Sequence, residues 1–174
     1  VLHHTTHRSA FQKKLIDQPL MKNVIADMIL ESDAAANLAM RVARSVDCQE
    51  EDENEKSISR IFTTVSKYWI TKRAPYLIFE ALECHCGPGY IEESIMPRLY
   101  REAPLNSIWE GSGNVMCVDV LRAMQKDKNA ISSVFNELEK ARGLNAHYDL
   151  NVDSLFHELK NPEDLEIKSR SITE

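Results

Sequence analysis

A single carboxylate, Glu110, stands where residue types and spacing could support chemistry. It follows the bulky aromatic Trp109 and precedes a Gly-Ser-Gly turn that starts at Gly111. Apolar neighbours that remove water from a carboxylate disfavour its charged form and make it a better base near neutral pH. We expect Trp109 to supply that desolvation, and Gly111 and Gly113 to let the backbone approach a bound ligand closely. The segment is therefore a candidate active site.

The same residues also allow a structural role for Glu110. Ser107 and Glu110 fit the capping box, in which a serine and a glutamate three residues later satisfy free N–H groups at a helix N-terminus. From these residues alone, a helix cap and a catalytic base both remain open.

Histidines and cysteines offer two further kinds of chemistry. His3 and His7 could share a helix face, but no carboxylate completes a metal site, and we expect solvated or hydrogen-bonding histidines. His85 suits a helix C-terminus, whose dipole favours a histidine. The cysteines lack the paired spacing of a zinc site, so we expect no metal and small buried thiols in a reducing intracellular compartment: Cys48, Cys84, Cys86 and Cys117.

The elements that must position these residues are helices. Apolar residues recur at helical spacing from Leu20 to Val42, which predicts a long helix from Pro19 to about Val46. An acidic segment then favours the N-terminus of a second long helix, in which Pro75 predicts a kink. Further helices are predicted over 91–100, 112–124, 129–142, 152–159 and 162–171, with a sharp break at 87–89 and no convincing strand. We expect an all-α, up-and-down antiparallel bundle with a helical C-terminal extension.

The amino-acid composition limits the classes of protein to which this chain can belong. The chain has 174 residues, 43% hydrophobic and 28% charged, with a net charge of -6, which is ordinary for a soluble globular protein. No apolar run approaches the roughly 20 residues of a membrane helix. Seven basic and ten acidic residues in 125–174 argue against a nucleic-acid surface. Both ends look like cuts in a longer chain, so we expect a fragment.

Four short sequence motifs occur in a fixed order along the chain. They are Arg8-Ser9-Ala10-Phe11 with Leu15, Glu83 to Tyr90, Tyr100-Arg101-Glu102-Ala103, and Ile108-Trp109-Glu110-Gly111-Ser112. In this order they resemble the C-terminal helical domain of the flavin-dependent acyl-CoA dehydrogenases, whose motifs are R-x-x-F-G-x-x-L, Gly-Gly-x-Gly-aromatic, R-[DE]-A and I-[YW]-E-G-[ST]. The fuller string 97–114 resembles the AidB-like branch, named for a bacterial protein of the adaptive response to alkylation. The resemblance predicts a domain over 1–124 and an extension over 125–174, which that branch shares.

This resemblance implies an FAD-dependent enzyme that oxidises a fatty acyl-CoA to its 2-enoyl product. Glu110 then removes the α-proton while the β-hydride passes to FAD, and this role displaces the cap as our preferred interpretation. Arg8 matches the family arginine that contacts the cofactor pyrophosphate. The implied cofactor-binding positions are Arg8, Ser9, Ala10, Phe11, Gln18, Pro19, Glu83, Cys84, His85, Cys86, Gly87, Ser112, Gly113 and Asn114.

The resemblance also implies partners. In that family FAD lies between a β-domain and the C-terminal helices, partly across a subunit interface. We therefore expect an N-terminal helical domain and a β-domain in the same protein, and a homotetramer arranged as a dimer of dimers. The implied setting is fatty acid metabolism, with mitochondrion or cytoplasm left open. Without a β-domain to complete the flavin pocket, this chain alone should not turn over substrate.

Three departures from the family pattern concern the cofactor positions. Gln12 and Cys86 stand where the family has glycines, and Glu83 replaces a common glutamine.

For Arg101 and Glu102 we expect structural ion pairs or subunit contacts rather than substrate contacts, and Arg122 is left out of the catalytic set.

Two other function classes remain open. One is a flavoprotein that binds acyl-CoA with little turnover in a regulatory role. The other is a DNA-associated flavoprotein that protects against alkylation, which the acidic C-terminal segment argues against.

Overall fold

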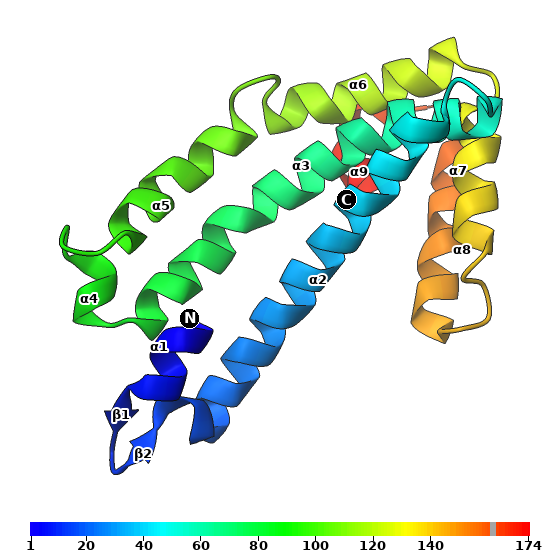
Figure 1. Cartoon of the computed structure of the whole chain (residues 1–174). Coiled ribbons are helices and arrows are strands. Elements are labelled where there is room, and N and C mark those ends of the chain that lie inside the picture. The colour runs from blue at the N-terminus through cyan, green and yellow to red at the C-terminus, as the bar shows by residue number, and fades with distance from the viewer. Residues whose placement is uncertain (161–162) are drawn as a thin grey trace. The chain divides into compact units, whose positions relative to one another are not determined.

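The computed structural model describes residues 1–160 and 163–174 and consists mainly of helices (Figure 1). The two long helices are α2 (Pro19–Cys48) and α3 (Glu53–Cys84), and α3 continues through Pro75. The other elements are α1 (Leu2–His7), η1 (Leu15–Asp17), α4 (Gly87–Tyr90), α5 (Met96–Glu102), η2 (Ala103–Ser107), α6 (Gly113–Lys126), α7 (Ala130–Glu139), α8 (Ala146–Lys160) and α9 (Leu165–Thr173). The predicted all-α class is confirmed. Throughout the described residues, every helix is too short or too polar to cross a membrane.

The expectation of no strand is wrong in one place. Strands β1 (Ser9–Ala10) and β2 (Lys13–Lys14) form a two-residue antiparallel hairpin. Each strand is too short to show the alternation of apolar and polar residues by which strands are recognised in a sequence.

Several predicted boundaries also shift. The break predicted at 87–89 lies at 85–86, between the end of α3 and the short helix α4, and the predicted helix over 91–100 begins only at Met96. The helix predicted from residue 152 begins at Ala146, because Asn145 Oδ1 accepts the N–H groups of His147 and Tyr148 at 2.8 and 3.1 Å and so caps it. Pro162, the predicted start of the last helix, lies outside the described residues.

The chain divides into two compact units. The first unit comprises Val1–Leu38 and Ile70–Trp109, and the second comprises Ala39–Trp69 and Glu110–Glu174. The first unit holds α1, the hairpin, most of α2, the second part of α3, α4 and α5. In it, the Arg73 guanidinium on α3 pairs with the Glu31 carboxylate on α2. The Phe79 and Tyr100 rings join α3 to α5, with centroids 5.8 Å apart.

The second unit has a core that joins three helices. Ile61 of α3, Val120 and Ala123 of α6, and Ala130 and Val134 of α7 form one buried cluster. Helix α9 packs along α6, so the C-terminal segment is part of this unit.

The acidic segment between α2 and α3 favours the start of α3, as predicted. Asp52 Oδ1 accepts the Asn54 N–H at 2.8 Å, and Glu53 and Glu55 lie in the first turn of the helix. Besides its place at the start of α3, Glu55 has an ion-pair partner on α2 that the sequence did not reveal. Its carboxylate pairs with Arg41 of α2 at 2.8 Å, and Arg41 also pairs with Glu137 of α7 at 2.6 Å.

Candidate functional site

Glu110 lies in a tight turn that leads into α6. After η2 the chain reaches Glu110 with φ 53° and Gly111 with φ 109°, and α6 begins with Ser112 as its N-cap residue. Ser107 lies within η2, where its hydroxyl donates to the Pro104 carbonyl at 2.9 Å. The capping-box alternative is therefore wrong: Ser107 is not at the start of α6, and Glu110 occupies the turn before it.

In the part of the chain that the structure describes, Glu110 is not desolvated as its place beside Trp109 led us to expect. Trp109 is 55% exposed, and the Glu110 side chain is also exposed. The Glu110 carboxylate is therefore in contact with solvent. Any groups that shield the Glu110 carboxylate from water would therefore lie outside the described residues.

The turn after Glu110 is fixed by two contacts that the sequence did not predict. The half-buried Lys67 of α3 donates a hydrogen bond from its ammonium to the Gly111 carbonyl. The flexible end of the Met116 side chain of α6 lies against Gly111, whose φ of 109° favours glycine. No sequence motif links Lys67 to Gly111, because they are 44 residues apart.

Three predicted cofactor residues follow Glu110 at the start of α6. Ser112 and Asn114 are exposed, and Gly113 is partly buried. The Ser112 side chain makes no capping hydrogen bond, whereas its carbonyl accepts the Met116 N–H at 3.0 Å. The Ser112 hydroxyl and the Asn114 amide are thus on the surface beside the candidate base.

The hairpin after α1 carries the first group of predicted cofactor residues. Ser9 pairs with Lys14 and Ala10 with Lys13, so Phe11 and Gln12 form a two-residue loop with φ 53° and 64°. Turns of this length favour positive φ at both central residues. The turn therefore forms with Gln12 in the place of the family glycine.

Two further residues of this group brace or follow the hairpin. Gln18 donates from Nε2 to the Ala10 carbonyl at 2.9 Å, and Pro19 begins α2. Arg8 is exposed, and Phe11 at the tip is 91% exposed. The hairpin thus presents a guanidinium and an aromatic ring to the surroundings.

The second group of predicted cofactor residues lies where α3 ends. Cys84 is buried with its thiol 3.8 Å from the Met21 sulfur, and burial raises the pKa of this thiol. Glu83 and Cys86 are exposed, and Cys86 has φ 54°. A glycine adopts such a φ without strain, which explains why the family favours glycine there. The expectation of buried thiols holds for Cys84 and Cys117, but Cys86 is exposed and Cys48 is intermediate, and all four are free.

Two histidines bring these groups of residues together. The His4 ring of α1 lies against the His85 ring at the end of α3, with centroids 4.7 Å apart. Burial, followed by the nearby His85, lowers the pKa of His4. His85 Nδ1 is 2.6 Å from the Ala81 carbonyl, which fits a histidine at a helix C-terminus. The hairpin and the residues around Gly87 thus belong to one unit, whereas Glu110 and 112–114 belong to the other.

The remaining candidates have structural partners. Arg101 pairs with Glu92 at 2.6 Å, and Glu102 pairs with Arg98 at 2.9 Å. His3 and His7 stack with centroids 4.5 Å apart. Among the residues that the structure describes, no three His, Cys, Asp or Glu side chains are grouped to hold a metal ion.

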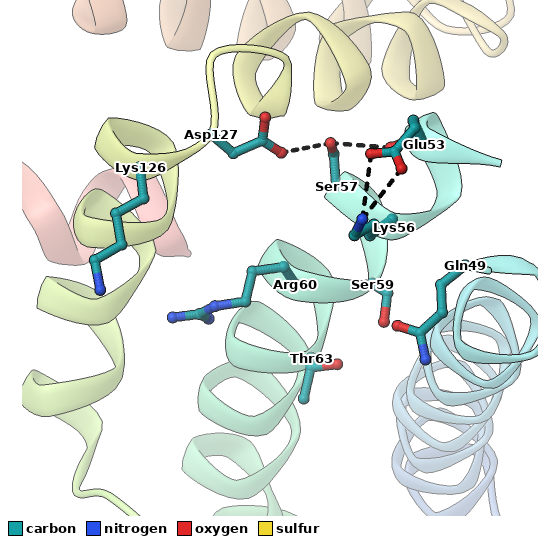
Figure 2. A pocket seen from close by; sticks show the side chains of 9 residues that line it. All are labelled: Gln49, Glu53, Lys56, Ser57, Ser59, Arg60, Thr63, Lys126 and Asp127. Carbon is teal, nitrogen blue, oxygen red and sulfur yellow. Dashed lines mark hydrogen bonds and ion pairs between the residues drawn. The ribbon is translucent and has the colours of Figure 1, made fainter.

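A pocket of about 630 Å³ lined by polar and charged residues opens beside the first turns of α3 (Figure 2). Figure 2 shows Arg60 reaching from α3 toward α6, which ends at Lys126. Two of the cations are already paired, Arg60 with Asp119 at 2.8 Å and Lys56 with Glu53 at 3.1 Å. The pocket therefore has little excess positive charge to hold an anion. Its lining includes none of the predicted site residues: Gln49, Glu53, Lys56, Ser57, Ser59, Arg60, Thr63, Lys126 and Asp127.

Comparison with known proteins places the chain in a family. Residues 1–125 match the sequence profile of the acyl-CoA dehydrogenase C-terminal domain. The chain is 40% identical over 161 residues to AidB of Escherichia coli (strain K12), covering 92% of this chain and 30% of that protein. It is 29% identical over 143 residues to acyl-CoA dehydrogenase family member 11 of Caenorhabditis elegans, covering 80% of this chain and 23% of that protein.

Solved structures agree with this placement. The apo form of Bd2924 superposes with a TM-score of 0.87 at 28% identity, covering 98% of this chain and 34% of that chain. Caenorhabditis elegans ACDH-11 in complex with C11-CoA shares the fold, with a TM-score of 0.88 at 24% identity over 98% of this chain and 32% of that chain. The chain spans about a third or less of the length of these relatives. From its sequence match and its fold, the chain belongs to the acyl-CoA dehydrogenase family, in which residues 1–125 correspond to the C-terminal domain.

Proposed function

We propose that this chain is the C-terminal part of an FAD-dependent acyl-CoA dehydrogenase in which Glu110 removes the α-proton of a fatty acyl-CoA. The observation that carries the proposal is the placement of Glu110, exposed in a positive-φ turn that is fixed before α6. An exposed carboxylate on a fixed backbone can be presented to a substrate bound against this surface. The C11-CoA bound by ACDH-11 supports a fatty acyl-CoA as the ligand class.

The residues of the first unit fit a flavin cofactor. Arg8, Lys13 and Lys14 are exposed on and beside the hairpin, and guanidinium and ammonium groups suit a pyrophosphate. Phe11 offers an exposed ring for packing. When bound, FAD would supply the acceptor for the β-hydride. Arg8 would hold the cofactor pyrophosphate, and backbone groups near Gly87 would approach the cofactor closely.

Glu110 and its surroundings would supply the proton chemistry. The α-proton of a thioester is weakly acidic, so its removal requires a positioned base and donors for the developing enolate oxygen. Because Glu110 and Trp109 are exposed here, exclusion of water would come from the N-terminal helical domain and the β-domain. The greater length of the relatives leaves room for both domains.

The remaining proposals concern the assembly and the setting. We propose that residues 1–124 form the family domain with 125–174 as a helical extension, and that the complete protein is a dimer of dimers. We also propose fatty acid metabolism in a reducing compartment, which suits the four free thiols.

The experiment that tests this function replaces the base in the complete FAD-loaded protein. We expect Glu110→Gln to abolish bleaching of the flavin absorbance by saturated acyl-CoAs of increasing length while FAD stays bound. Glu93→Gln, which neutralises another exposed glutamate, is the matched control and should bleach normally. Normal bleaching in Glu110→Gln would refute the assignment.

A flavoprotein that binds acyl-CoA with little turnover is a second candidate, favoured by the exposure of Glu110. Stable acyl-CoA binding without flavin reduction in the wild-type protein would support it. A DNA-associated role has less support, because basic residues of the C-terminal segment pair with acids: Arg142 with Glu139 and Asp153, and Lys140 with Glu137. Absence of DNA binding at low salt would remove that role.

A further inference from the structure

The backbone of Gly111, the residue after Glu110, is contacted by side chains from two helices. Lys67 of α3 donates a hydrogen bond from its ammonium to the Gly111 carbonyl. The end of the Met116 side chain of α6 also lies against Gly111. All of these residues belong to the second unit. The turn that carries Glu110 is therefore anchored to α3 and packed against α6.

Such an anchor matters because the turn adopts a backbone conformation that side chains disfavour. Glu110 has φ 53° and Gly111 has φ 109°. A residue with a Cβ atom persists at positive φ where its surroundings hold it there. A hydrogen bond from an ammonium group is stronger than one between neutral groups, so Lys67 is well suited to hold the turn.

We propose that Lys67 is a positioning residue for the carboxylate of Glu110. This inference rests on the proposed function of Glu110 as the base. The φ of Glu110 sets the direction of its Cα–Cβ bond, and hence where its carboxylate can reach. By fixing the Gly111 carbonyl, Lys67 restrains the Gly111–Ser112 peptide, and through the backbone of Gly111 it keeps the base in one orientation toward the α-carbon. Proton transfer depends steeply on such placement.

The test separates proton removal from hydride transfer. It uses the complete FAD-loaded protein and an acyl-CoA without hydrogen on its β-carbon, 3,3-dimethylbutanoyl-CoA. In D₂O the base removes an α-proton and returns a deuteron after exchange with solvent, so deuterium enters the α-carbon and no electrons are transferred. NMR of the acyl-CoA follows this exchange.

We expect Lys67→Met to slow α-deuteration by about 10- to 100-fold, because the carboxylate loses its fixed placement. The FAD content and the Kd of the acyl-CoA should stay within about twofold of wild type. Lys67→Arg, which keeps a charged donor but cannot place it where the smaller ammonium lies, should also slow exchange, though less than Lys67→Met does. Lys72→Met, which removes an exposed lysine from the same helix, is the matched control and should exchange at the wild-type rate.

Exchange at the wild-type rate in Lys67→Met would overturn the proposal. A loss of exchange that only follows loss of FAD or of acyl-CoA affinity would overturn it too, because it would show a general structural role. Should Lys67→Met not fold, Lys67→Arg decides: slowed exchange with full FAD content supports the proposal, and an unchanged rate overturns it.

Glu110→Gln in the same assay distinguishes two failures. Exchange that persists in Glu110→Gln refutes the proposed function itself. Exchange that is lost in Glu110→Gln but unaltered in Lys67→Met refutes only the role of Lys67.

Discussion

Replacing Arg41 with methionine should destabilise the protein strongly, because this residue holds two carboxylates at once. Its guanidinium is 2.8 Å from Glu55 and 2.6 Å from Glu137, and the three side chains are only 19%, 11% and 17% exposed. Arg41→Met leaves two half-buried carboxylates without their main partner. Truncating one partner of a buried ion pair costs about 3–5 kcal/mol.

The pKa of Glu137 gives a second measure of the same interaction. The hydrogen bond from Arg41 is the main cause that holds this pKa at about 2, below its ordinary value of 4.5. A tenfold change in the acid dissociation constant of a group corresponds to about 1.4 kcal/mol, so this lowering of the pKa corresponds to about 3 kcal/mol. Lys140 also lowers this pKa and remains in the variant. After allowance for Lys140 and for solvent screening, we expect the free energy of unfolding to fall by about 2–3 kcal/mol at pH 7.

The pH dependence has a definite sign. Because folding lowers the pKa of Glu137, the stabilisation is fully present above pH 4.5 and is lost as the pH falls toward 2. Urea denaturation followed by circular dichroism should therefore show a difference between wild type and Arg41→Met that shrinks from pH 5 to about pH 2. Arg44→Met, an exposed arginine on the same helix, is the control and should change stability by less than about 0.5 kcal/mol. A difference between wild type and Arg41→Met that is equal at pH 7 and pH 2 would refute the reasoning.

Three further substitutions test the packing, each read from the midpoint of urea denaturation. Gly89→Ala should destabilise by about 1–3 kcal/mol, because its Cβ would lie 2.1 Å from the Leu82 carbonyl oxygen; an unchanged midpoint would contradict this close approach. Cys86→Gly should stabilise by about 0.5–1 kcal/mol, since relief at φ 54° exceeds the added chain entropy of glycine; a lower midpoint would show that the cysteine side chain contributes packing. Ile61→Ala should cost about 2–5 kcal/mol, because Ile61 is 2% exposed in the core with Val120; a cost below about 1 kcal/mol would mean that the site collapses around the cavity.

The long helices could be predicted because their signals are local. Apolar spacing and Pro19 indicated α2, and the acidic residues before Ile58 marked the start of α3. The two-residue strands gave no such signal, and the start of α8 depended on a single cap, Asn145.

The sequence could propose the residues of the candidate site, but it could not predict their environment. The motif around Glu110 identified a candidate base, and the structure adds the positive φ of Glu110 and Gly111. The desolvation expected from Trp109 failed because adjacency in sequence does not specify burial, and both side chains are exposed. Lys67 could not be found from sequence, since its contact to Gly111 joins segments 44 residues apart.

The packing of α9 along α6 bears on where this protein can be cut. On α6 Cys117 is fully buried, and Tyr68 of α3, which is 3% exposed, accepts a hydrogen bond from Arg170 Nε of α9 at 3.3 Å. A chain ended at residue 125 would keep the whole family match yet expose these surfaces to water. The segment that matches the family therefore ends inside the compact unit to which α9 belongs.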